Sequence, residues 1–191
     1  MRRALIALIL VGLTTTALVA GTKIQAQRNE TFNFATLKTW TWNPGKPGGV
    51  KVWLTAESKS EPVQRQYEPM IMKSVEDELA RRGYTQAAPG ATPDFTVTYY
   101  LLITAGTSAQ EMGQFLPATT AWALPPFTAQ TQAFHMYPMG SLVIDVGAPN
   151  ADHVVWRGVA QAEVELKKTD EARAETLKRI MKDLFAKLPK K

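Results

Sequence analysis

The sequence predicts an α+β fold, in which a mostly antiparallel sheet of about four to five strands packs two helices on one face. Three observations lead to this class. Apolar and polar residues alternate over 94–104. A second alternating stretch over 141–167 is interrupted by a turn rich in Gly, Pro and Asn. Apolar residues recur at helical spacing over 64–82 and 170–188. The expected order is β-α-β-(long loop)-β-β-α.

The domain begins with an expected strand over 32–42, where aromatic residues alternate with polar ones on both sides of a break at Leu37. We expect a bend or bulge at that break. The stretch 43–49 is a loop by its content of proline and glycine. Residues 50–54 form either a short strand or the approach to the first helix.

The first helix is expected to end at Gly83, because glycine readily takes the left-handed conformation at that point. Proline is tolerated in a first helical turn, so Pro69 places the start of the regular helix near Glu68. The apolar face of this helix consists of Ile71, Met72, Val75 and Leu79.

The C-terminal half is predicted as a β-hairpin followed by a helix. Strands over 141–146 and 154–167 flank a turn at 147–152, and the second strand has one polar face. The last helix is expected to start at a cap on Thr169 or Asp170.

An irregular insertion at about 105–140 interrupts this order. Ala105 to Gly140 has no steady hydrophobic period and is rich in Gly, Pro, Thr, Gln and Met. A connection this long inside a compact domain is uncommon and is typical of a functional segment.

The N-terminus has the composition of an export signal. Two arginines precede an apolar run of about 17 residues that ends at Ala20, and a polar stretch with a small residue at Ala26 follows. We expect residues 1–26 to be a signal peptide cleaved after Ala26, with Ala20 or Gln27 as alternative sites. Residues 27–191 are then expected to form a single domain.

An uncleaved tether in the inner membrane is the alternative, since the apolar run has about the minimum length that spans a bilayer. The chain has no cysteine, so we expect no lipid attached to cysteine, no disulfide and no thiolate metal site. The expected location is periplasmic or secreted, without stable membrane insertion after cleavage.

The net charge of +5 does not indicate a nucleic-acid surface. Three of the 22 basic residues lie in the predicted signal, which leaves 19 basic against 17 acidic residues and a net charge of +2. Binding to nucleic acid requires a basic stripe on one face. We therefore expect no nucleic-acid partner.

Several short motifs occur in an order that resembles a known family. They are Phe32-Asn33-Phe34, Thr39-Trp40-Thr41-Trp42, Glu78-Leu79-Ala80-Arg81-Arg82-Gly83-Tyr84, Pro93-Asp94-Phe95-Thr96-Val97-Thr98-Tyr99, Gly140-Ser141-Leu142-Val143-Ile144-Asp145, Val154-Val155-Trp156-Arg157-Gly158-Val159-Ala160 and Leu188-Pro189. The series resembles the bacterial envelope proteins grouped as domain of unknown function 4136, many of them lipoprotein-like. The resemblance extends over about residues 32–189, and the Val-Trp-Arg-Gly step is its most specific part.

The resemblance implies an envelope location and an α+β fold. It implies no activity, because none is assigned to the family. The chain departs from the family pattern by lacking a lipid-attachment cysteine and by having Gly147-Ala148-Pro149 in place of an acidic hairpin tip. The insertion at 105–140 matches no part of the pattern.

Three residues near the end of the insertion are candidate metal ligands: His135, Met136 and Met139. Imidazole and thioether groups together suit copper(I). Methionine also fills gaps in packed loops, and the absence of a repeated Met spacing favours that role. We therefore expect neither a metal nor another cofactor.

The sequence contains no catalytic constellation that stands out from ordinary structural use. His153 follows Asp152 at a turn, but no Gly-x-Ser-x-Gly nucleophile elbow accompanies it. The carboxylates of residues 76–78 lie at helical spacing from two arginines, which favours surface ion pairs over acid–base chemistry. Asp145, inside an apolar strand, is expected to be half-buried at a sheet edge or in a helix cap. We expect no enzymatic activity.

Aromatic residues in irregular segments are the best candidates for an interaction surface: Trp53, Trp122, Phe127 and Tyr137. Anchoring of long loops is the alternative role for them. We expect an exported, non-catalytic interaction or accessory protein that binds another envelope protein through the insertion and the exposed sheet. The alternative is a small-molecule or copper-binding protein with a site between the insertion and the sheet.

Overall fold

The computed structural model describes residues 22–54, 57–105, 138–149, 153–164 and 169–190. This part of the chain forms one sheet and two α-helices, which confirms the α+β class. The elements in order are β1 (Lys23–Arg28), the 3₁₀ turn η1 (Phe34–Thr36), β2 (Thr39–Trp42), β3 (Gly48–Trp53), α1 (Ser60–Arg81), β4 (Thr85–Gln86), β5 (Phe95–Ala105), β6 (Pro138–Gly147), β7 (Val154–Glu163) and α3 (Asp170–Phe185).

The sheet has seven described strands and is mixed, which corrects the expectation of about four to five mostly antiparallel strands. Its order is β1-β7-β6-β5-β2-β4, and β3 also pairs with β5. Strands β1, β7, β6 and β5 are antiparallel neighbours. Strands β2 and β3 run parallel to β5 one after the other, since Trp42 pairs with Val97 and Gly48 pairs with Tyr99. Residues 43–47 therefore leave this edge and rejoin it.

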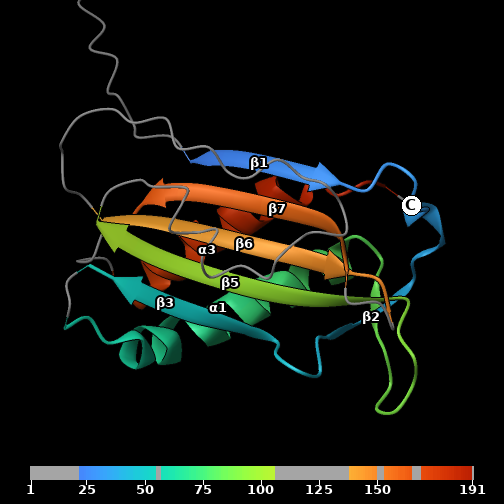
Figure 1. Ribbon diagram of the computed structural model, residues 1–191, viewed down its shortest axis with the longest axis horizontal. Helices are drawn as coiled ribbons and strands as arrows, with labels where there is room; N and C mark the ends of the chain where they lie inside the picture. The colour runs from blue at the N-terminus through green and yellow to red at the C-terminus, as the bar shows by residue number, and fades with distance from the viewer. Residues whose placement is uncertain (1–21, 55–56, 106–137, 150–152, 165–168, 191) are drawn as a thin grey trace, which may run out of the picture.

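Both helices lie on one face of the sheet, behind the strands in the view of Figure 1. Side chains that alternate towards them form the main core, made of Val50, Val52, Phe95, Val97, Tyr99, Leu101, Ile103, Leu142, Ile144, Val146, Trp156 and Ala160 from the sheet and of Ile71, Val75, Leu79, Leu177, Ile180, Met181, Leu184 and Phe185 from the helices. The intervening strand residues point to the opposite face. We call this the helix-free face, because neither described α-helix lies on it.

Helix α1 begins at Ser60 and contains Pro69, so the predicted start near Glu68 was wrong. The early turns are mostly polar and give little apolar periodicity in the sequence. Val63 and Tyr67 nevertheless pack against the core and fix these turns as helix. The predicted stop is confirmed, since Gly83 has a φ of 77° immediately after the cap residue.

The expected strand over 32–42 is present only from Thr39 onward. Residues 34–36 form a 3₁₀ turn, and the side-chain oxygen of Asn33 accepts a hydrogen bond from the backbone N–H of Ala35 at 3.1 Å. Leu37 ends this turn, so the predicted break lies at the right place. Strand β1 was not foreseen, because its residues had been assigned mainly to the signal, and the boundary predicted after Ala26 lies inside it.

The C-terminal hairpin and helix are close to the prediction. Strand β6 begins a few residues earlier than expected, at Pro138, and β7 ends at Glu163. The side chain of Thr169 caps α3 by accepting a hydrogen bond from the backbone N–H of Ala172 at 3.3 Å. This confirms one of the two predicted caps.

Candidate functional site

The helix-free face carries polar and apolar side chains in rows that cross the strands. The strand register defines four of them: Thr98–Asp145–Arg157–Gln27, Tyr100–Val143–Val159–Gln25, Lys51–Leu102–Ser141–Gln161 and Trp53–Thr104–Met139–Glu163. Leu102, Val143 and Val159 form a small buried apolar cluster at the centre, and Tyr100 packs against it. The face therefore differs from an ordinary solvated sheet surface, which would be polar throughout.

Asp145 and Arg157 form an ion pair in the first of these rows. Arg157 Nε donates to Oδ1 of Asp145 and Arg157 Nη2 donates to Oδ2, both at 2.6 Å. Their side chains are 4% and 5% exposed, so the expectation that Asp145 would be half-buried at an edge or cap was wrong. Burial raises the pKa of Asp145, and the hydrogen bonds and charge of Arg157 oppose that shift. Both carboxylate oxygens are engaged, which suits a structural pair rather than an acid–base catalyst.

The row formed by Trp53, Thr104, Met139 and Glu163, which we call the Trp53 row, lies at one end of the sheet. Among the described residues, Trp53 is the one large hydrophobic side chain that is exposed, at 46%. The next register pair after Thr104–Met139 joins Ala105 to Pro138, where β5 ends and β6 begins. Both ends of the segment 106–137 are therefore attached to the sheet beside Trp53. Trp122, Phe127 and Tyr137, the other residues of the predicted surface, lie outside the described residues.

The motif Trp156-Arg157-Gly158 is part of the packing of the domain. Trp156 is fully buried and stacks on Phe185 with ring centroids 5.9 Å apart, and its indole Nε1 donates to the carbonyl oxygen of Lys187 at 3.4 Å. A Cβ atom on Gly158 would lie 2.4 Å from Trp156 Cη2, closer than packing permits. Together with the Arg157 ion pair, these contacts give every residue of the motif a structural role.

Two other motifs of the resemblance meet at Asp94. Its Oδ2 atom accepts hydrogen bonds from the backbone N–H of Lys38 at 2.9 Å and from that of Thr39 at 2.7 Å. The Thr39 hydroxyl also donates to the same oxygen, at 3.0 Å. These bonds lower the pKa of Asp94 and tie the start of β2 to the start of β5. No local pattern predicts this contact, since the partners are far apart along the chain.

A cavity of about 80 Å³ lies on the helix side, between the sheet and the two helices. The small strand residues Gly140, Ala160 and Ala162 leave this space between the sheet and α3. The cavity is lined by Tyr67, Leu101, Gly140, Leu142, Ala160, Ala162, Glu163, Val164, Arg173, Thr176, Leu177 and Ile180. The lining of the cavity is mostly apolar.

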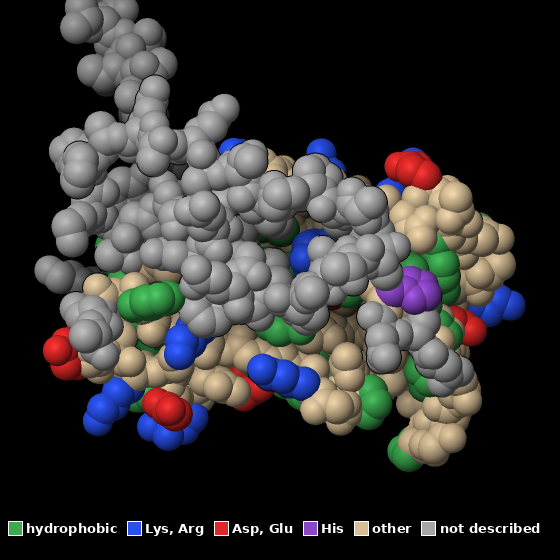
Figure 2. Space-filling view, in the orientation of Figure 1, with side chains coloured by type: hydrophobic (Ala, Val, Ile, Leu, Met, Phe, Trp, Pro, Cys, Tyr) green, Lys and Arg blue, Asp and Glu red, His purple; other side chains and the backbone are tan. Residues whose placement is uncertain are grey.

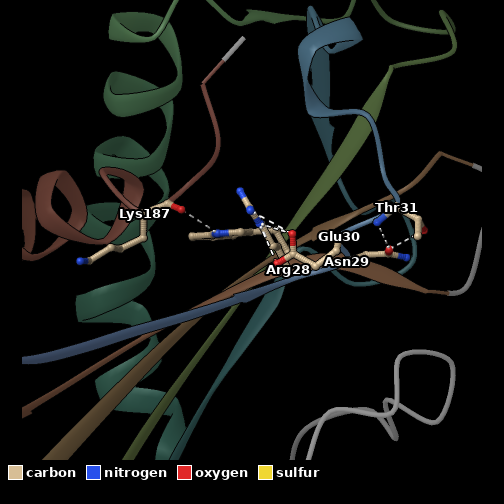
Figure 3. A network of polar contacts seen from close by, with 6 residues as sticks. Arg28, Asn29, Glu30, Thr31 and Lys187 are labelled. Carbon is tan, nitrogen blue, oxygen red and sulfur yellow. Dashed lines mark hydrogen bonds and ion pairs between the residues drawn. The ribbon is translucent and has the colours of Figure 1, made fainter.

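A wider, open recess of about 540 Å³ lies beside β1, next to Trp156 and Lys187. Figure 3 shows the polar contacts there, with Arg28 turned towards Glu30 and Asn29 towards Thr31. Arg28 Nε donates to both carboxylate oxygens of Glu30, at 3.0 and 3.1 Å. Both side chains are exposed to solvent, so this pair is a surface contact of little weight for stability.

The candidate metal ligands are not brought together within the described residues. His135 and Met136 lie outside them, and Met139 is half-buried in the Trp53 row. In the described ranges, no group of three or more His, Cys, Asp or Glu side chains is placed to hold a metal ion.

The other chemical candidates have ordinary structural surroundings. His153 contributes its backbone carbonyl oxygen, which accepts a hydrogen bond from the N–H of Ala148 at 3.3 Å in the hairpin turn, and Asp152 lies outside the described residues. On α1, Glu78 pairs with Arg81 at 2.6 Å, as the helical spacing predicts, but Glu78 is buried rather than on the surface. Asp77 pairs with Lys73 instead of an arginine. Along the lower margin in Figure 2, basic and acidic side chains are interspersed and form no stripe of one sign.

These features define a small α+β domain whose most distinctive residues serve packing, strand pairing and a buried ion pair. The chain belongs to the family described as domain of unknown function (DUF4136), whose model matches residues 24–190. No curated protein matches the chain. None of the described helices is both long enough and apolar enough to cross a membrane.

Several solved structures match the chain at low sequence identity. A DUF4136 family protein from Bacteroides thetaiotaomicron is 13% identical, with a TM-score of 0.47 over 86% of this chain and 94% of that chain. The PelC dodecamer from Paraburkholderia phytofirmans is 8% identical, with a TM-score of 0.39 over 90% of this chain and 100% of that chain. A PDZ domain protein from Parabacteroides distasonis is 13% identical, with a TM-score of 0.46 over 88% of this chain and 36% of that chain. All three TM-scores are below 0.5, and we take no functional conclusion from them.

Proposed function

We propose that this protein is an exported, non-catalytic accessory protein of the bacterial envelope that binds another envelope protein. The contact surface is the exposed part of the Trp53 row together with the insertion at 105–140. The observation that carries the proposal is the exposure of Trp53, at 46%, at the sheet end to which both ends of the insertion are attached. Tryptophan is enriched among the residues that contribute most to protein interfaces.

The composition of the N-terminus supports the export part of the proposal, because a basic start, an apolar run and a small-residue exit are what the export machinery reads. The protein is then periplasmic or secreted. The engagement of Asp145, Asp94 and Glu78 in structural bonds supports the non-catalytic part.

Co-purification from periplasm tests the surface directly. Tagged wild-type protein is compared with Trp53→Ala and with a matched control, Lys178→Ala, whose side chain is exposed on α3 at 62%. We expect wild type and Lys178→Ala to recover the same amount of one partner protein. Trp53→Ala is expected to recover about tenfold less of it, a typical effect at an interface hot spot. Equal recovery of every protein by all three forms would count against the proposal.

A second variant tests the insertion. Because Ala105 and Pro138 are register partners, an Asn-Gly turn in place of 106–137 joins β5 to β6 as a two-residue hairpin. We expect this variant to fold and to lose the same partner as Trp53→Ala. If it binds that partner as wild type does, the insertion has no part in the contact.

The helix-side cavity favours a second candidate function, the binding of a small apolar molecule. Its lining is mostly apolar, and Arg173 and Thr176 are among the polar residues that line it. Thermal-shift measurements with fatty acids and sugars test this candidate. The same measurement with copper(I) tests His135, Met136 and Met139 as metal ligands. A raised melting temperature with a fatty acid that disappears in Ala162→Leu would favour it.

A further inference from the structure

Strand β1 is an integral part of the sheet. All six of its residues pair in register with β7, from Lys23 opposite Gln161 to Arg28 opposite Trp156. The side chain of Ile24 packs against the main core. Its register partner Ala160 is only 3% exposed. The family match begins at Ile24 and therefore includes most of this strand.

A cut after Ala26 would divide β1. It would remove Lys23 to Ala26, which are the partners of residues 158–161, and leave only Gln27 and Arg28 in the strand. The apolar side chain of Ile24 would be lost from the core with them. The edge of β7 from Gly158 to Gln161 would then present unpaired backbone groups to solvent, and bare edges of this kind promote aggregation.

We infer that the export signal is cleaved on the N-terminal side of Lys23, after Ala20 or Gly21, so that the mature protein keeps the whole of β1. This inference rests on the proposed export. The signal peptidase reads small residues at the exit of the apolar run. Ala20 and Gly21 meet that requirement as well as Ala26 does. The third residue before the cleaved bond is also expected to be small. It is Val19 for a cut after Gly21 and the larger Ile24 for a cut after Ala26.

The cleavage site is tested by determining the mature N-terminus of the protein purified from periplasm. Intact-mass measurement and N-terminal peptide mapping are expected to show a start at Gly21 or Thr22. A start at Gln27 overturns the inference and leaves export intact. An intact Met1 instead contradicts cleavage of the signal, and with it the basis of the inference.

A pair of substitutions gives an independent test. Valine is too large for the position before the cut, yet it is favoured in strands. Ala20→Val with Gly21→Val is expected to accumulate uncleaved precursor. Ala26→Val, at an exposed position of β1, is expected to be processed as wild type is. The reverse pattern, with Ala26→Val blocked and the double variant processed normally, overturns the inference.

Discussion

Asp145 on β6 and Arg157 on β7 face each other directly, and two nitrogens of the guanidinium each meet one carboxylate oxygen at 2.6 Å. The pair lies on the helix-free face of two central strands. A slip of one residue in the pairing of β6 with β7 would turn one of the two charged groups into the main core. The ion pair therefore specifies the register of the hairpin.

Asp145→Asn is expected to destabilise the domain by about 3–5 kcal/mol, because it removes the negative charge that both guanidinium hydrogen bonds reach in a buried setting. Replacing both residues, Asp145→Leu with Arg157→Met, is expected to cost less than either single change. Urea denaturation of Asp145→Leu, of Arg157→Met and of the double variant measures the coupling between the two side chains. A loss below about 1 kcal/mol for Asp145→Asn, as for a surface pair, would contradict the structural role of the contact.

Gly158→Ala is expected to destabilise the domain by about 1–3 kcal/mol, the usual range for an overpacked core. The added methyl group would lie 2.4 Å from Trp156 Cη2 and 2.9 Å from Leu184 Cδ1. Gly49→Ala is the matched control in another strand, since its nearest neighbour atom is Lys46 Cε at 3.5 Å. Chemical denaturation should place Gly49→Ala close to wild type, and equal losses for the two variants would refute this packing argument.

The pKa of Asp94 is lowered by its hydrogen bonds from the backbone of Thr39 and Lys38. The stabilisation from this carboxylate is therefore present above the ordinary aspartate pKa and is lost as the pH falls through the lowered folded-state value. Asp94→Asn should be less stable than wild type at neutral pH, and the difference should shrink below about pH 4. Unfolding free energies measured across this range check the sign. A difference that stays constant would show that the charge of Asp94 is not involved.

Burial and the hydrogen bond from Tyr99 Oη to Glu68 Oε1, at 2.5 Å, raise the pKa of Tyr99 far above its ordinary value. The folded state thus holds this proton more tightly than the unfolded state does. Stability should fall as the pH rises above about 10, the ordinary tyrosine pKa. Tyr99→Phe is expected to remove the step at the highest pH in a titration of tyrosinate absorbance. It should also reduce the loss of folding stability with rising pH. An unchanged titration curve would contradict the assignment.

Local sequence patterns were sufficient for the hairpin, for α3 and for the core residues of β5, because alternation and helical spacing depend on near neighbours alone. Pairing between distant segments was not accessible in this way. Nothing within β2 or β3 indicates that both run parallel to β5, and the two-residue β4 is too short to leave a pattern. Strand β1 was overlooked because most of its residues fall within the predicted signal peptide.

Parts of the candidate site were recoverable from the sequence. Trp53 was recognised as a surface candidate, although its place at the end of β3 needed the sheet register. The partner of Asp145 was within reach, since Arg157 lies across a predicted hairpin. The register of β6 against β7 shifts between Val146 and Gly147. Counting residues outward from the turn therefore pairs the wrong residues, and no sequence pattern indicates the shift.

The pairing of β1 with β7 determines when the sheet can be completed. Among the described strands, β1 is synthesised first, whereas its partner β7 lies near the other end of the chain. Strand pairs of such large sequence separation form slowly, because a long loop must close before the contact is made. The neighbouring hairpin of β6 and β7 is local and can form first. The edge of β7 that pairs with β1 therefore stays exposed during folding until β1 docks, and this is the stage at which the chain is most open to edge-to-edge aggregation.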